Sequence, residues 1–155
     1  MHPIEVLYVK VENNFCSIDS LFIFEVLYEV KMILKEDFEV SVIYITSPLE
    51  KNCDQELELF RLPAKKIGKF KVLLKVRPPN YENIEWEELT EVTIILLVIS
   101  YQNKELIRIG YYLNNEFNHN DKINSKDSNR THSVLRKILS DRPRITYFPF
   151  ISNQD

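Results

Sequence analysis

The sequence predicts an all-β protein with an immunoglobulin-like β-sandwich fold and one short helix near the C-terminus. Three observations favour this fold. Apolar residues recur at every second position in most segments, only one segment has clear helical spacing, and 155 residues suit a single domain, residues 1–155. Several short antiparallel strands with one apolar face each are typical of two sheets packed against each other.

Seven segments show the alternation that half-buried strands require. In residues 22–30, for example, Phe22 and Phe24 alternate with Ile23 and Glu25. In residues 69–76 the side chains on one parity are mostly lysines, so this basic cluster is predicted to be the outer face of a strand. The expected strands are residues 4–11, 22–30, 39–46, 69–76, 91–101, 105–113 and 144–150.

The turn, the helix and the longest loop have their own signals. Gln102 and Asn103 join two expected strands as a tight hairpin. Residues 118–131 are polar with a single apolar residue and are predicted to form a loop. Residues 132–141 follow, with Ser133 as a candidate N-cap and an end before Pro143. The apolar stripe of this expected helix consists of Val134, Leu135, Ile138 and Leu139.

Charge is unevenly distributed along the chain. Residues 1–60 contain four Lys or Arg and twelve Asp or Glu, whereas residues 61–77 contain seven basic residues and no acid. The net charge of −3 argues against a general nucleic-acid binder. An acidic half attracts a basic protein, although a run of charge is more often a solvated face.

The sequence offers no pattern for a catalytic, metal or cofactor site. The three histidines are not spaced as metal ligands, and we find no nucleophile or phosphate-binding motif. Cys16 and Cys53 fit neither a disulfide framework nor a metal pair, so we expect reduced thiols and an intracellular protein. The longest apolar run, residues 92–99, is shorter than the roughly 20 residues of a membrane helix, so we expect a soluble chain.

The expected hairpin 91–113 is apolar on both faces, which a sandwich strand does not need. Such a strand buries only one face in its own core. The second face is either covered by the chain's own loop or helix, or it is a binding surface, since Tyr and Arg are enriched at binding hot spots. The candidate patch consists of Val92, Ile94, Leu96, Arg108 and Tyr112.

The run "RIGYYLNNEF" (108–117) closely resembles the signature hairpin of the anti-silencing function histone chaperones, which bind the histone H3–H4 dimer. The resemblance extends from about residue 4 to residue 150. It implies a non-enzymatic nuclear protein that shields the H3 dimerisation surface and hands histones over for nucleosome assembly and disassembly. The other matching segments are residues 22–30, 34–44, 54–57, 92–101 and 136–146.

The resemblance also implies three groups of binding residues. The histone H3 site corresponds to Ile45, Asp54, Val92, Ile94, Leu96, Arg108, Tyr111 and Tyr112. The tail of histone H4 would dock as an added strand near Leu139, Pro143, Arg144 and Thr146. On the opposite side, an acidic pair with a neighbouring apolar groove would bind basic motifs of downstream chaperones. That site corresponds to Tyr28, Glu36, Asp37, Phe38, Phe60 and Leu62.

The expected partners are therefore the H3–H4 dimer and two downstream chaperones, histone regulator A and the large subunit of the chromatin assembly factor. We expect a monomer without cofactor, nucleic acid or membrane. The chain departs from the family at "LPAKKIG" (62–68), where the relatives have Gly-Pro-Val-Pro. The alternative reading is a non-enzymatic β-sandwich adaptor that binds short peptides in another pathway.

Overall fold

The computed structural model describes residues 2–46, 54–82, 84, 92–117 and 134–151. These residues form ten β-strands and no helix, so no described segment is a helix long and apolar enough to cross a membrane. The polar segment 118–131 lies outside the described residues. The strands are β1 (Ile4–Val11), β2 (Phe15–Ser17), β3 (Phe22–Val30), β4 (Phe38–Ile45), β5 (Gln55–Leu62), β6 (Gly68–Val76), β7 (Thr93–Tyr101), β8 (Lys104–Phe117), β9 (Val134–Ile138) and β10 (Arg144–Tyr147).

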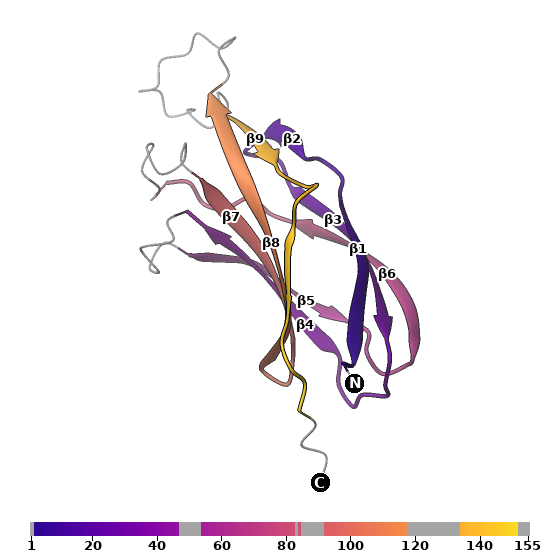
Figure 1. The fold of residues 1–155 in the computed structure, drawn as a ribbon. Helices are drawn as coiled ribbons and strands as arrows, with labels where there is room; N and C mark the ends of the chain where they lie inside the picture. Colours follow the sequence, from indigo (N-terminus) through magenta and orange to yellow (C-terminus); the bar gives the residue numbers. More distant parts are fainter. Residues whose placement is uncertain (1, 47–53, 83, 85–91, 118–133, 152–155) are drawn as a thin grey trace.

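Two antiparallel sheets pack face to face as the predicted sandwich (Figure 1). The small sheet has the order β1-β3-β6. The large, seven-stranded sheet has the order β2-β9-β8-β7-β4-β5, with β10 also paired to β8. β8 is long enough to pair with β10 through residues 107–110 and with β9 through residues 113–117. β4, β7 and β8 are therefore central strands with partners on both sides.

The core lies between the two sheets and contains one face of each long strand. In β3 and β4, buried residues alternate with partly exposed ones along the whole strand. Aromatic rings fill much of the space, with Tyr28 stacked on Phe70 at a centroid distance of 5.6 Å and Phe24 against Tyr111 at 6.0 Å. This pattern is the one that the period-two alternation predicts.

The seven predicted strands are all present, with ends that differ by a few residues, and three further strands, β2, β5 and β9, were not predicted as strands. β2 has only three residues and carries too short a pattern to be read. In β5, Leu57 and Leu62 are both buried although they have opposite parity. The register shift between Val42 and Ile43 on the neighbouring strand accounts for this change, because a bulge switches the face that the following residues occupy.

The predicted C-terminal helix is wrong, because Val134–Ile138 form strand β9. This segment pairs with β2 and with the far end of β8, whose unpaired edge offers a hydrogen-bonding partner. Arg136, on the buried face of β9, places its guanidinium 3.8 Å from the ring centroid of Phe22 and donates to the carbonyl oxygens of Ser20 and Leu21. Tertiary pairing therefore overrides the helical spacing of apolar residues that predicted a helix over residues 132–141.

The predicted hairpin turn is confirmed in detail. Tyr101 ends β7 and Lys104 begins β8, so the connection has two residues. Gln102 and Asn103 both have positive φ, 48° and 67°. Positive φ at both central positions is the requirement of a type I′ turn, whose twist matches that of the flanking strands.

The acidic and basic parts of the chain meet in the small sheet. β3 pairs along its length with β6, so Glu29 lies opposite Lys69. The Lys71 ammonium lies 3.3 Å from the Glu25 carboxylate on the exposed surface. The lysines of β6 are exposed, as predicted for the outer face of a strand, and part of their charge is balanced by β3.

Candidate functional site

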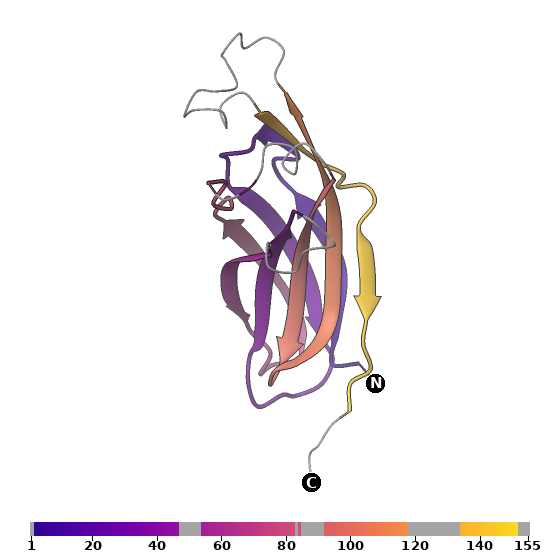
Figure 2. The same ribbon diagram turned by 90° about the vertical axis from the view of Figure 1, so that its left-hand side faces the viewer.

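The outer face of the large sheet changes from apolar at one end of the strands to polar at the other. β4, β7 and β8 lie side by side in register, and Figure 2 shows β7 and β8 at the front with β10 beside β8. Successive cross-strand rows run Ile45–Ile94–Tyr112, Ile43–Leu96–Gly110 and Ser41–Val98–Arg108. We call the surface formed by Ile43, Ile45, Ile94, Leu96 and Tyr112 the apolar face.

The first row carries the exposed end of the apolar face. Ile45 and Ile94 are half-buried, and the ring of Tyr112 is 44% exposed. Val92, directly before β7, is 62% exposed. No described part of the chain covers these side chains completely. This favours the hypothesis that the outer face of the hairpin is a binding surface over the hypothesis that the described chain covers it.

Gly110 in the second row makes room for Leu96. A Cβ atom at position 110 would lie 3.0 Å from Cδ2 of Leu96, closer than ordinary van der Waals contact. The leucine side chain therefore lies across the backbone of β8 instead of standing away from the sheet. Because Gly110 has no side chain, nothing projects from β8 between Arg108 and Tyr112. The apolar face is therefore shallow at this point, which suits a surface that another molecule covers.

The third row ends in an ion pair. Nη2 of Arg108 lies 2.9 Å from the Glu105 carboxylate, and both side chains are more than two-fifths exposed. Residues three apart in a strand normally point to opposite faces, but the register shift after Ile99 brings Glu105 to the face of Arg108. The pair is solvated and holds the guanidinium at the margin of the apolar face.

Tyr111 lies on the opposite face from Tyr112, in the core. Its side chain has 0% exposure, and burial raises the pKa of its phenol to about 12. The Tyr111 hydroxyl has no hydrogen-bond partner among the described residues. Of the eight residues expected at the histone H3 site, Tyr111 is therefore the one that the fold separates from the outer surface.

The residues expected at the H4 site adjoin the apolar face. Arg144 and Thr146 of β10 lie opposite Gly110 and Arg108, so their side chains extend the second and third rows. The Leu139 N–H donates to the Tyr112 carbonyl at 3.0 Å, and Leu139 is 36% exposed. Pro143 is half-buried directly before β10. Among the described strands β10 pairs only with β8, so no described strand occupies its outer edge.

Asp54 lies at the other end of the first row. It directly precedes Gln55, the β5 residue that pairs with Tyr44, and it is exposed. The apolar face therefore has a carboxylate on its β5 side and a guanidinium on its β8 side. Such a charged margin around an apolar centre is typical of protein-binding surfaces.

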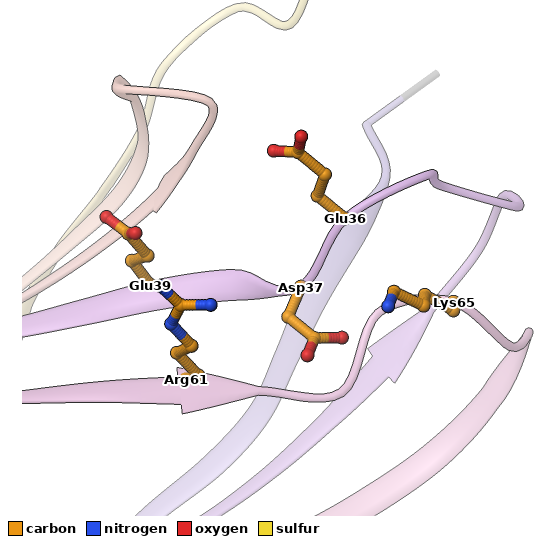
Figure 3. Close-up of a pocket in the computed structure, with 5 residues that line it drawn as sticks. All are labelled: Glu36, Asp37, Glu39, Arg61 and Lys65. Atoms are coloured by element: carbon orange, nitrogen blue, oxygen red, sulfur yellow. The ribbon is translucent and has the colours of Figure 1, made fainter.

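The acidic pair lies at the opposite end of β4, in a pocket with a volume of about 330 Å³. Figure 3 shows acidic side chains from β4 and the preceding loop and basic side chains from β5 and the following loop, with Asp37 between Arg61 and Lys65. No ion pair joins these groups among the described residues. We call this site the charged pocket, formed by Glu36, Asp37, Glu39, Arg61 and Lys65.

The four apolar residues expected in a groove beside the acidic pair lie mostly in the core. Tyr28, Phe38 and Leu62 are at most 2% exposed, and Phe60 is half-buried. The Tyr28 hydroxyl donates to the Pro63 carbonyl at 2.9 Å, which ties the loop after β5 to the core. These side chains support the β4–β5 end of the sheet from inside and do not line its surface.

Several residues of the two surfaces were not predicted from the sequence and lie there because of the strand register. Ile43 lies two residues before Ile45, so the alternation of residues 39–46 already placed both side chains on the same face of the strand. The sequence shows that Glu39, Arg61 and Lys65 are charged but not that they lie together, because the pairing of β4 with β5 was not predicted. Among the described residues, no group of three or more His, Cys, Asp or Glu side chains is arranged to hold a metal ion.

Comparison with known proteins gives a consistent result. The sequence model of a family described as ASF1 like histone chaperone matches residues 1–152. The probable histone chaperone ASF1A of Arabidopsis thaliana is 34% identical over 151 residues, which cover 96% of this chain and 76% of that protein. Histone chaperone asf1 of Dictyostelium discoideum is 32% identical over 150 residues, 96% of this chain and 97% of that protein. Histone chaperone ASF1 of Saccharomyces cerevisiae is 33% identical over 152 residues, 97% of this chain and 54% of that protein.

Proposed function

Because this chain belongs to the ASF1-like histone chaperone family, we propose that its apolar face binds histone H3 within the H3–H4 dimer. The observation that carries the proposal is the row Ile45–Ile94–Tyr112 on the three central strands of the large sheet, which no described part of the chain covers completely. Central strands are rigid, so little conformational entropy is lost when a partner covers them. Burying half-exposed aliphatic and aromatic side chains supplies binding free energy.

The mechanism is competitive shielding and involves no catalytic step. While the apolar face covers H3, the H3 surface that would pair two H3–H4 dimers is occupied. Release to a recipient then hands the dimer over for nucleosome assembly, and capture of a dimer serves disassembly. This role places the chain in the nucleus, where it acts as a monomeric, non-enzymatic protein.

The open edge of β10 is the proposed site for the tail of histone H4. A strand added at an open sheet edge gains main-chain hydrogen bonds, while alternate side chains provide specificity. Arg144 and Thr146 lie in the rows of Gly110 and Arg108, so a tail on β10 would continue the surface that H3 covers. One histone dimer would then contact the apolar face and β10 together.

The charged pocket is the proposed site for downstream chaperones of the histone regulator A type and for the large subunit of the chromatin assembly factor. Its carboxylates, Glu36 and Asp37, would meet basic residues of a short motif. Glu39 and Ile45 are six residues apart on β4, a span of about 20 Å. This separation allows a histone and a downstream chaperone to bind at the same time.

A pull-down with recombinant histones tests the proposal. Tagged protein is mixed with H3–H4 and, separately, with H2A–H2B at 0.3 M salt, which suppresses nonspecific contacts between acidic protein and basic histone. We expect retention of H3–H4 and not of H2A–H2B. A folded chain that retains neither histone dimer would contradict the proposal and favour the peptide-binding adaptor. Equal retention of both histone dimers would indicate nonspecific electrostatic attraction to basic proteins and would contradict a specific H3 site.

A further inference from the structure

We propose that the charged pocket selects a peptide with charges of both signs, in which an acidic side chain lies near the basic ones. This inference rests on the proposed second site and specifies its ligand. An uninterrupted basic motif would satisfy Glu36 and Asp37 alone. The pocket, however, also presents two bases to whatever enters it.

The pocket brings acidic and basic side chains from two strands and their adjoining loops close together. The carboxylates of Glu36, Asp37 and Glu39 come from the β4 side, and Arg61 and Lys65 come from the β5 side (Figure 3). Glu39 and Arg61 occupy directly opposite positions in the β4–β5 register. With Asp37 between Arg61 and Lys65, a ligand that enters the pocket meets both signs of charge close together.

The opposite charges of the pocket form no close ion pairs with one another. No nitrogen–oxygen distance of 4.0 Å or less joins any of the five side chains, although such pairs occur elsewhere in the described residues. Glu36, Arg61 and Lys65 are exposed, and Asp37 and Glu39 are half-buried. Both signs of charge are consequently available to a ligand.

A purely basic ligand is at a disadvantage in this arrangement. A guanidinium placed against Asp37 also approaches Arg61 and Lys65, between which Asp37 lies (Figure 3). Like charges brought close together oppose binding, and an acidic side chain on the ligand converts this repulsion into attraction. Each exposed ion pair typically changes affinity by about 1.4- to 5-fold.

The neighbouring lysines of β6 do not contribute to this site. Lys69, Lys71 and Lys75 lie on the outer face of the small sheet, where Lys71 pairs with Glu25. Lys69 lies opposite Glu29 in the β3–β6 register. The basic character of the pocket therefore comes from Arg61 and Lys65, and the β6 lysines provide a matched control.

A panel of labelled peptides tests the inference by fluorescence anisotropy with the full chain at 0.1 M salt. Each twelve-residue peptide has a central Arg-Arg pair in a neutral background. Each test peptide carries a single Asp, at one of the four positions before the pair or the four positions after it. A peptide with Asn at the same position is the control for each. We expect at least one Asp peptide to bind about 3- to 10-fold tighter than its Asn control, an effect that two ion pairs would produce.

The double variant Arg61→Gln/Lys65→Gln should abolish this preference and bind the Asn peptides more tightly than the unmodified chain does. The control Lys69→Gln/Lys75→Gln removes the same charge and should leave the preference unchanged. Circular dichroism checks the fold of both variants. Equal binding of every Asp peptide and its Asn control, or a preference that survives in Arg61→Gln/Lys65→Gln, overturns the inference.

The proposed second site has its own readout in the same assay. If all peptides bind equally and Glu36→Gln/Asp37→Asn abolishes binding, the second site stands and the mixed-charge inference fails. If no peptide binds the unmodified chain or Arg61→Gln/Lys65→Gln, both the inference and the second site are contradicted. The two ideas therefore fail with different results.

Discussion

The apolar face and the charged pocket lie on the same sheet but differ in almost every physical respect. The apolar face occupies the central strands β4, β7 and β8. On these strands its first two cross-strand rows contain only aliphatic, aromatic and glycine residues. The charged pocket lies at the β4–β5 end of the sheet and is lined by five charged side chains. Ligand binding at the first should depend on desolvation and shape, and at the second on charge and therefore on salt.

This difference indicates how one small sheet serves two partners. A rigid apolar surface gives affinity that persists at high salt, which suits a cargo that must be held. A solvated pocket with charges of both signs gives modest affinity and discrimination between ligands. The predictions that follow separate the two surfaces, from the largest expected effect to the smallest.

Ile94→Arg should abolish H3–H4 binding and leave the charged pocket intact. Ile94 lies between Ile45 and Tyr112 in the first row, so a guanidinium there would be desolvated without a partner. The expected loss is about 3–5 kcal/mol of binding free energy. Isothermal titration with H3–H4 measures it, and circular dichroism checks the fold. A folded variant with normal H3–H4 affinity would rule out this face as the histone site.

Tyr111→Ala and Tyr112→Ala should have opposite consequences although the residues are neighbours. Tyr111 is buried against Phe24, so its truncation should cost about 3–5 kcal/mol of unfolding free energy. Tyr112 is exposed, so its truncation should cost about 2–4 kcal/mol of H3–H4 binding and little stability. Urea unfolding and titration measure the two quantities. Comparable loss of stability in both variants would contradict the assigned faces.

Arg108→Glu should weaken H3–H4 binding more than Asp54→Ala does. Arg108 adjoins the apolar rows, and the substitution also places a second carboxylate beside Glu105. We expect about 2–4 kcal/mol for Arg108→Glu and less than about 1 kcal/mol for Asp54→Ala, because a rim carboxylate acts mainly on association. Titrations at 0.15 M and 0.5 M salt test this order. The Asp54 effect should shrink at the higher salt, and an Asp54 effect that is larger or independent of salt would place this residue inside the interface.

Reversing the acidic pair should have the smallest effect on the histone. Glu36→Lys/Asp37→Lys changes the charged pocket, which lies about 20 Å along β4 from the first row. We expect H3–H4 affinity to change by less than about 1.4 kcal/mol, a factor of 10, while an Arg-Arg peptide loses measurable binding. Anisotropy and titration on one preparation give both values. Loss of both ligands to the same extent would show that the two surfaces are not independent.

The sequence by itself determined the strands with clear alternation, because side chains on successive strand residues point to opposite faces whatever the partner strand is. It also indicated the hairpin turn at Gln102 and Asn103, because these polar residues separate two alternating segments and asparagine tolerates the positive φ of such a turn. The two-faced character of β7 was visible for the same reason. These features depend on local order along the chain.

Only the tertiary structure decided which strands lie together. Residues 134–138 are a strand because the end of β8 offers them an edge, and no local pattern contains that edge. β5 was hidden because a bulge in its pairing with β4 breaks its alternation. The same pairing brings Arg61 opposite Glu39, so the mixed charge of the pocket exists only in the folded sheet. Side chains distant in sequence meet through backbone hydrogen bonds, whose register a linear sequence does not specify.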